Sequence, residues 1–267
     1  MKISQLKQAC QGQNAQAIDN LIKSTDEYQA VVNSDDTGEK LRVYAAAVIF
    51  LRGDAEDSDS ALAQASEQRK AVNGVILELV FPKRQLTWMQ SGVDGELLMG
   101  SQTDFVKMLD GNVFDLNSPK TKLNCWEAVL LGAMSGGLVN NASELIRIYN
   151  DTPKQFDTLL KAALVSGAGR AYQPGHPLST PVHGDIVLFS GLAHVALAVG
   201  PNAQWNQTEI LSFWPAPWVN NFESGKAVTT MAVTSIEDIV QWLNTNMPGY
   251  PVNITFGSPN WNALNRS

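Results

Sequence analysis

Cys125 is the residue whose position most favours covalent chemistry. It lies in the stretch TKLNCWEAVLLGAMSGGLV at 121–139, where a polar approach meets a long apolar run rich in small residues. Asn124 is a suitable helix N-cap, and Glu127, three residues later, can complete a capping box. Cys125 is then the first helical residue, where unpaired N–H groups and the helix dipole favour thiolate. The alternative is a buried structural thiol, since free cysteine is among the most buried residue types.

The predicted helix has one face made only of small or slim residues. Ala128 or Val129 follows one turn after the cysteine, then Gly132, and then Ser135 or Gly136. We expect this face to lie close against a sheet and to leave nothing bulky over the thiol.

A nucleophilic thiol needs a base, and the chain has three histidines. His176 stands between two prolines and is most simply a loop residue, and His183 precedes a Gly-Asp turn. His194 opens HVALAVG, where strand alternation puts it on the same face as two alanines. This pattern predicts that His194 points at the helix with the slim face. If its role is only structural, a backbone carbonyl would be its partner.

The segment HGDIVLFSGLAHVALAVG, residues 183–200, resembles the Gly-Asp strand, turn and histidine strand of NlpC-type cell-wall hydrolases, a branch of the papain-like superfamily. NCWEAVLLGAMSGGLV, residues 124–139, looks like their cysteine helix, and the resemblance covers about residues 120–215. It implies an α+β domain in which the nucleophile helix packs on an antiparallel sheet. It also implies that Cys125 is the nucleophile and that His194 takes its proton and later protonates the leaving amine.

Two positions depart from that family's pattern. Its members usually carry Asp-Cys-Ser or Asp-Cys-Gly at the nucleophile, where this chain has Asn124, Cys125 and tryptophan. They also place a third polar residue on the next strand, to fix the histidine tautomer. Ser212 is nearest to that position and Asn206 lies a little before it, so the third member stays open, and a two-residue dyad is an alternative. The oxyanion hole would combine the Cys125 N–H with the Asn124 side chain, unless capping engages that side chain.

Two tryptophans follow the third predicted strand in SFWPAPW. Trp214 and Trp218 lie in a loop stiffened by proline. They are candidate substrate contacts at the mouth of a cleft. Ordinary hydrophobic packing of the loop is the other interpretation, and it is the one we prefer.

The elements that must position these residues follow from periodicity. Residues 3–74 show apolar spacings of three and four, so residues 1–74 are predicted to form a helical N-terminal region. From Val75 the runs VILELVF, QLTWMQ and GELLMG predict a strand and a hairpin, opening a papain-like domain over 75–267. Later signals predict helices at SQTDFVKML and 142–166, and strands at DIVLF, AHVALAV and TEILSFW.

Composition narrows the partners and the compartment. The net charge is −7 and no basic block is interleaved with aromatic residues, so nucleic acid is not an expected partner. No apolar run reaches the ~18 residues of a membrane span or forms a signal peptide, which predicts no membrane insertion and a protein that is cytoplasmic as made. Export by a signal-independent secretion system stays open. Two isolated cysteines form neither a disulfide framework nor a zinc site, and no metal or cofactor is expected.

These features predict a cysteine hydrolase that cleaves an amide bond through an acyl-enzyme. Cell-wall peptides are the first substrate suggested by the resemblance, and a bacterial effector or toxin with an immunity or target protein as partner is one setting. The first alternative is an effector that uses the same residues to deamidate or transamidate glutamine or asparagine side chains of proteins, or to transfer an acyl group. The second is a papain-like scaffold that has lost its chemistry and serves as a binding module.

Overall fold

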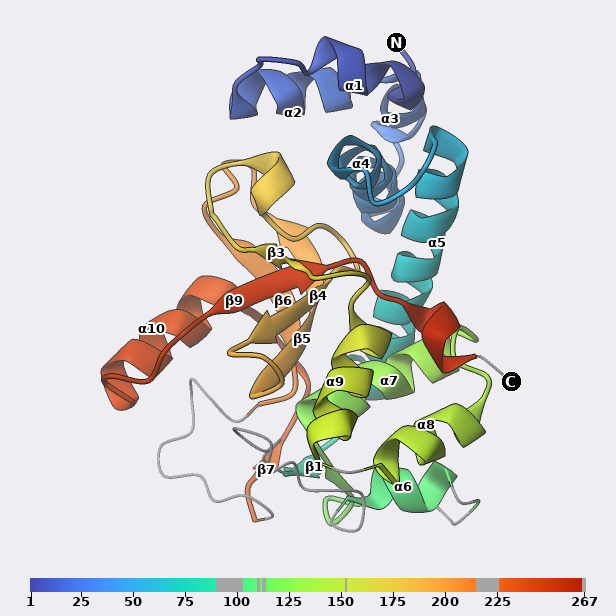
Figure 1. Ribbon diagram of the computed structural model, residues 1–267, viewed down its shortest axis with the longest axis vertical. Helices are drawn as coiled ribbons and strands as arrows, with labels where there is room; N and C mark the ends of the chain where they lie inside the picture. The colour runs from blue at the N-terminus through green and yellow to red at the C-terminus, as the bar shows by residue number, and fades with distance from the viewer. Residues whose placement is uncertain (90–102, 110, 112–113, 152, 215–225, 266–267) are drawn as a thin grey trace.

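The computed structural model describes residues 1–89, 103–109, 111, 114–151, 153–214 and 226–265. In these ranges the chain combines helices with antiparallel sheets, so the predicted α+β class is confirmed. In Figure 1 the N-terminal helices lie at the top, the larger sheet lies below them, and the helices between residues 104 and 164 lie at the lower right.

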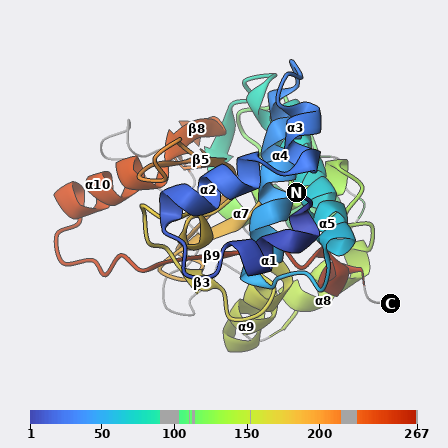
Figure 2. The ribbon, with the colours of Figure 1, turned by 90° about the horizontal axis from the view of Figure 1, so that it is seen from above.

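The N-terminal region folds as a group of helices around a buried core of its own. α1 and α2 pack across α4, while α4 and α5 run side by side (Figure 1, Figure 2). This agrees with the helices predicted before residue 75. The bounds are η1 Ile3–Gln5, α1 Leu6–Ala9, α2 Ala15–Lys23, α3 Asp26–Val31, α4 Thr37–Arg52 and α5 Ser58–Val75, where η denotes a 3-10 or π-helical turn.

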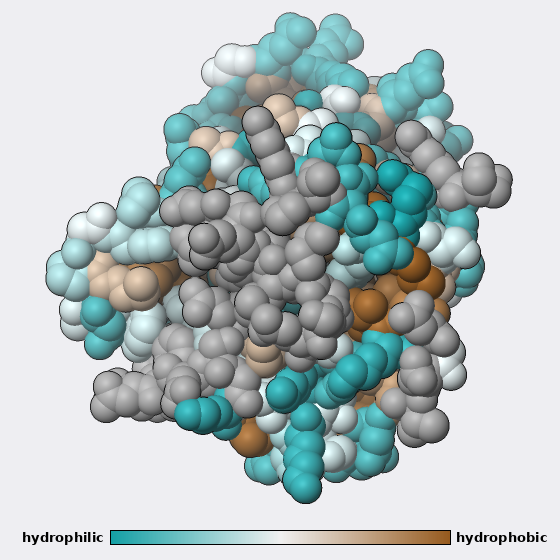
Figure 3. Space-filling view, turned by 60° about the horizontal axis from the view of Figure 1, so that its bottom comes forward, coloured by the Kyte–Doolittle hydropathy of each residue, from teal (hydrophilic) through white to brown (hydrophobic). Residues whose placement is uncertain are grey.

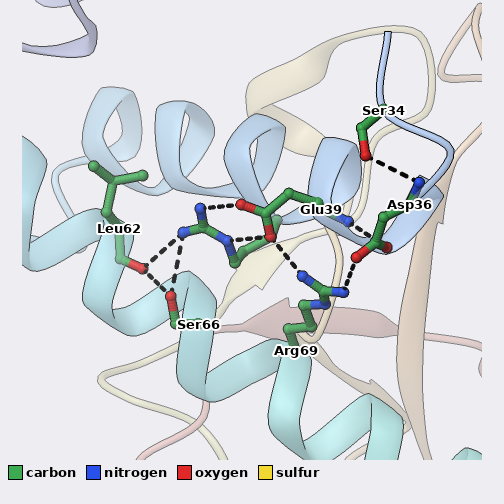
Figure 4. A network of polar contacts seen from close by, with 7 residues as sticks. Ser34, Asp36, Glu39, Leu62, Ser66 and Arg69 are labelled. Atoms are coloured by element: carbon green, nitrogen blue, oxygen red, sulfur yellow. Dashed lines mark hydrogen bonds and ion pairs between the residues drawn. The ribbon is translucent and has the colours of Figure 1, made fainter. Parts of the chain in front are cut away.

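Ion pairs fix α4 against α5 (Figure 4). Arg69 of α5 pairs with Asp36, the N-cap of α4, at 2.6 Å, and with Glu39 in α4. Glu39 also pairs with Arg42, which lies in α4 as well. Arg42 donates a further bond of 3.2 Å to the hydroxyl of Ser66. The hydrogen bonds from Arg42 are the main reason why the pKa of Glu39 is lowered. Because single pairs near the surface stabilise a fold only weakly, the network chiefly sets the relative position of the two helices.

The structure corrects the strand predicted for VILELVF, residues 75–81. α5 continues to Val75 and passes directly into a π-helical turn, η2, over Ile76–Val80. Val75 and Leu79 are buried, whereas Leu77 between them is exposed. The β-propensity of this run is overridden because a helical spacing of four turns the two buried side chains toward α7.

The larger sheet carries His194. In the described part of the chain it has six strands in the order β3-β9-β4-β5-β6-β8, and each neighbouring pair is antiparallel. Three of them, β4, β5 and β6, are the strands predicted from DIVLF, AHVALAV and TEILSFW. The bounds are β3 Arg170–Ala171, β4 Ile186–Phe189, β5 His194–Pro201, β6 Thr208–Ser212, β8 Ala232–Ser235 and β9 Ile254–Gly257.

A smaller sheet lies at the end of the molecule away from the N-terminal helices (Figure 1). Its described strands have the order β2-β1-β7, with β1 parallel to β2 and antiparallel to β7. β1 forms within QLTWMQ, but both edges of β1 pair with strands distant in sequence, and the predicted hairpin partner GELLMG lies outside the described residues. The bounds are β1 Leu86–Trp88, β2 Lys122–Leu123 and β7 Val228–Thr229.

The remaining helices include those predicted at SQTDFVKML and at 142–166. The region 142–166 forms two helices, α8 and α9, and α10 packs on β6 and β8. The bounds are α6 Asp104–Leu109, α7 Cys125–Ser135, α8 Ala142–Tyr149, α9 Pro153–Leu164, η3 Pro177–Ser179, α10 Ile236–Asn246 and η4 Trp261–Leu264.

Glycines allow α7 to lie almost in backbone contact with α5. A Cβ on Gly74 of α5 would stand 2.0 Å from the carbonyl oxygen of Gly132, and one on Gly132 would stand 2.8 Å from the backbone nitrogen of Val75. A Cβ on Gly136 would likewise stand 2.8 Å from the carbonyl oxygen of Lys70. The slim face of α7 therefore meets α5 at Gly132 and Gly136, while its first residue, Cys125, lies against β5. This corrects in part the prediction that the face packs on a sheet, because Gly74 of α5 provides the matching small surface.

The Gly-Asp pair ahead of β4 attaches the N-terminal helices to the larger sheet. Asp185 is fully buried and accepts hydrogen bonds from Arg52 of α4 at 2.8 Å and Gln68 of α5 at 3.1 Å. Gly184 has a φ of +83°, and a Cβ there would stand 2.4 Å from the Cβ of Gln68. A charge buried this deeply is tolerated only when it is paired and hydrogen-bonded. The motif is thus explained by the contact between α4, α5 and the sheet.

Gly74→Ala is expected to destabilise the protein. Alanine favours an isolated helix by about 1 kcal/mol, but the added methyl group overlaps the backbone of α7, so we expect a net loss of about 2 kcal/mol in the free energy of unfolding. Urea denaturation measures this, with Asn73→Ala at the exposed neighbouring position as control. A Gly74→Ala variant as stable as that control would contradict the close helix contact.

Candidate active site

The first turn of α7 forms as predicted. The side-chain oxygen of Asn124 accepts from the backbone N–H of Glu127 at 2.9 Å, and Glu127 accepts from the Asn124 N–H at 3.0 Å. This is the predicted capping box, and Cys125 is the first helical residue. β2 ends at Leu123, so the cysteine follows directly on a strand. Capping engages the side-chain oxygen of Asn124, which is an acceptor, so it does not occupy the amide NH2 group, the part of the side chain that can donate to an oxyanion.

The sulfur of Cys125 lies against the start of β5. The backbone N–H of Val195 donates to Cys125 Sγ across 3.3 Å, although the two residues are 70 positions apart. Val195 directly follows His194, so the structure brings the cysteine and the histidine strand together. Cys125 is only 1% exposed, which shows that the small residues of α7 do not leave the thiol open.

His194 is held by Ser212 on the neighbouring strand. Its ring nitrogen Nε2 lies 2.9 Å from Ser212 Oγ, and Ser212 pairs in register with Ala196, two residues along β5. The side chains therefore meet diagonally on one face of the sheet. Asn206, the other candidate for the third position, is exposed and bonds to Asn202 in the turn before β6, so the structure places it away from His194.

The imidazole of His194 is packed between aromatic rings. The ring centres of Phe189 and Trp214 lie 5.3 and 5.0 Å from it. The ring is buried, and this loss of hydration lowers the pKa of His194 to about 3. The histidine is thus neutral at physiological pH, the state in which a ring nitrogen can accept a proton.

The two tryptophans proposed as substrate contacts have different outcomes. Trp214 is 9% exposed and packs on His194 and, edge to face at 5.2 Å, on Trp242 of α10. Trp218 lies outside the described residues. The contacts of Trp214 therefore fit the packing interpretation, and they also make it part of the wall around the imidazole.

The other two histidines lie elsewhere. His183 is buried and its Nδ1 lies 2.9 Å from the carbonyl of Val199, and burial lowers its pKa. His176 accepts from the backbone N–H of Leu178 at the start of η3. Both bind backbone groups, His176 within its own loop and His183 on β5.

A buried network behind the cysteine was not anticipated. Glu127 is fully buried, and its Oε1 accepts hydrogen bonds of 2.7 Å from both Thr103 and Tyr149. Tyr149 in turn accepts from the indole N–H of Trp126 at 3.1 Å. Burial is the largest cause that raises the pKa of Glu127 to about 7. The capping pattern identified Glu127 in the sequence, but its bonds to Thr103 ahead of α6 and to Tyr149 in α8 depend on the tertiary fold.

Three further properties of the described residues concern metal ligands, membrane-spanning helices and surface hydropathy. Within the described ranges, no three His, Cys, Asp or Glu residues gather as metal ligands. No helix among the described residues is long and apolar enough to span a membrane. Figure 3 shows the end of the molecule near β1 and α6, where hydrophilic residues dominate the described surface and hydrophobic ones gather at one side.

Comparisons with protein families, curated proteins and solved structures give no significant match. The geometry of Cys125, His194 and Ser212 therefore carries the functional argument.

His194→Gln is expected to weaken the pH dependence of stability. The unfolded chain protonates this histidine near a pKa of about 6.5, whereas the folded chain does so only at about 3. The contribution of the neutral ring is therefore present above pH 6.5 and lost as pH falls, with a slope of about 1.4 kcal/mol per pH unit.

Urea denaturation between about pH 6 and 4 measures this slope. Comparing the variant with the wild type isolates His194, because His183 and the carboxyl groups titrate in both chains. Equal slopes would contradict the burial of a neutral ring.

Proposed function

We propose that this chain is a papain-like cysteine hydrolase that cleaves amide bonds, with Cys125 as nucleophile and His194 as base. The observation that carries the proposal is the contact between the N-terminal end of α7 and the start of β5, where Val195 donates to Cys125 Sγ beside the Ser212-bound His194. A thiol, a neutral imidazole and a polar residue on the next strand are the parts that thiol-dependent acyl transfer requires.

The reaction begins with proton transfer from the Cys125 thiol to the neutral ring of His194. The Val195 N–H and the positive end of the α7 dipole stabilise the thiolate. The sulfur attacks the amide carbonyl, and the C–N bond breaks as His194 returns the proton to the leaving amine. Water then gives a proton to His194 while its oxygen attacks the thioester carbonyl. The C–S bond breaks, the carboxylic acid product leaves, and the sulfur takes the proton back from His194. The backbone N–H of Cys125 and the Asn124 side-chain amide are the candidate donors to the oxyanion.

Ser212 is the orienting residue in this scheme. When Nε2–H of His194 donates to Ser212 Oγ, the lone pair of the other ring nitrogen, Nδ1, is left to accept the thiol proton. Serine replaces the larger polar residue that NlpC-type enzymes usually carry at this place. The resemblance to that branch makes peptides of the bacterial cell wall the first substrate class to test.

Cys125→Ala is expected to abolish amide cleavage. Removing the nucleophile should lower the rate by a factor of at least about a thousand. The release of peptide fragments from purified cell-wall material, followed by mass spectrometry, measures this, and Cys10→Ala is the matched control because Cys10 lies in the N-terminal core. Equal activity in wild type and Cys125→Ala would overturn the proposal, and a wild type without activity on any amide or ester would favour the binding module.

Ser212→Ala is expected to lower kcat by roughly ten- to a hundredfold with little change in KM, because the ring loses its fixed orientation while substrate contacts stay. Ser212→Thr keeps a hydroxyl group and should recover most of the rate. Steady-state kinetics on the same substrate measure both variants. An unchanged kcat in Ser212→Ala would show that the hydrogen bond to His194 is only structural.

The burial of the sulfur favours a second candidate, the deamidation or transamidation of protein side chains or acyl transfer. A peptide main chain needs a cleft on both sides of the nucleophile, whereas a single glutamine or asparagine side chain needs less open surface around a sulfur that is 1% exposed. Mass spectrometry separates the two. Replacement of a side-chain NH2 by OH in an intact protein indicates deamidation, and a cleaved chain indicates a peptidase.

A further inference from the structure

The Glu127 carboxyl group is more deeply buried and accepts more hydrogen bonds than a helix cap requires. Capping boxes serve equally well with glutamine, and they stand at exposed helix starts in most proteins. Here the carboxyl is fully buried, which carries a large desolvation cost. Thr103, ahead of α6, and Tyr149, the last residue of α8, each donate a 2.7 Å hydrogen bond to it.

This carboxyl group holds the peptide next to the nucleophile. Its Oε2 accepts the N–H of Asn124, and the Glu127 N–H in turn binds the Asn124 side chain. Glu127 thus forms hydrogen bonds with both the backbone and the side chain of Asn124. Its carbonyl carbon is bonded to the nitrogen of Cys125, so fixing Asn124 also fixes the direction of the Cys125 N–H.

We propose that Glu127 is a positioning residue for Cys125: anchored by Thr103 and Tyr149, it aligns the Asn124–Cys125 peptide as the oxyanion donor, and its negative charge restrains ionisation of the thiol. The inference rests on the proposed function for its oxyanion part, whereas its effect on the thiol requires no substrate. The first part predicts an effect on kcat, and the second predicts an effect on the reactivity of the sulfur.

The charged groups around this site determine the direction of the second effect. Asp104 of α6 repels the Glu127 charge, and the hydrogen bond from Tyr149 stabilises it. His194 on β5 is neutral above about pH 3 and supplies no positive charge to offset it. Glu127 ionises as pH rises through about 7. Its charge then opposes the thiolate, because the Tyr149 hydroxyl that donates to Glu127 Oε1 also lies within electrostatic reach of Cys125.

Alkylation of Cys125 by iodoacetamide tests the effect on the thiol. Rates are followed by peptide mass spectrometry between about pH 5 and 9, with Cys10 as a second thiol in the same chain. In the wild type we expect the rate to rise less steeply above about pH 7. In Glu127→Gln this change of slope near pH 7 should disappear. Its alkylation rate at about pH 8 should be roughly tenfold higher than that of the wild type, which corresponds to a thiol pKa lower by one unit.

Glu67→Gln, the same change at an exposed position of α5, is the matched control and should follow the wild type. Tyr149→Phe is the second variant and applies even if Glu127→Gln folds poorly. Losing the hydroxyl removes a hydrogen bond that lowers the pKa of Glu127, so the change of slope should move to higher pH. Identical profiles for wild type, Glu127→Gln and Tyr149→Phe would overturn the effect on the thiol.

Kinetics on an amide substrate test the oxyanion part. Glu127→Leu cannot accept the Asn124 N–H, so kcat should fall at least about tenfold at constant KM, while Glu127→Gln should recover it. An unchanged kcat in Glu127→Leu would overturn this part. Failure of the proposed function looks different: Cys125→Ala then leaves amide cleavage unchanged, while the alkylation profiles still report whether Glu127 acts on the thiol.

Discussion

α5 and α7 cross so closely that their backbones almost touch, and this contact sets the position of α7. Gly74 and Gly132 bring the two helix backbones into contact, at a distance that no side chain larger than hydrogen permits. α7 is thereby held between the N-terminal helices on one side and β5 on the other. Since a rigid helix has a fixed rise per residue, clamping its middle also fixes where its first residue lies. That residue is Cys125, and it meets β5 at Val195.

The N-terminal helices are therefore part of the scaffold of the candidate site. The buried pair of Arg52 and Asp185 attaches α4 to the start of β4, and Gln68 of α5 completes it. The two hydrophobic cores meet along α5, where Ala65 belongs to the first and Ala71 to the second. The sequence pattern changes near residue 75, but the parts before and after this residue pack against each other along α5. The division into domains stays a prediction.

Two buried groups with opposite pKa shifts flank the cysteine. The pKa of His194 is lowered to about 3 and that of Glu127 is raised to about 7, in both cases chiefly because burial disfavours the charged form. The first shift keeps the imidazole neutral and also weakens it as a base, and the second places a titrating carboxyl group near neutral pH. Pairs of titratable groups with environments that separate their pKa values are typical of catalytic sites. The papain-like assignment and the activity remain proposals that these features support.

Local features could be predicted from the residues: the capped helix start at Cys125, the strand that begins with His194, the following strand with Ser212, and the α+β class. These depend on caps and periodicities that act over a few residues. Four further features could be found only in the folded chain: VILELVF is helical, the slim face of α7 meets α5, Asn206 lies away from His194, and Glu127 is buried with Tyr149. The physical reason is that each of these outcomes depends on contacts between segments far apart in the chain, which can override local propensity and which no spacing records.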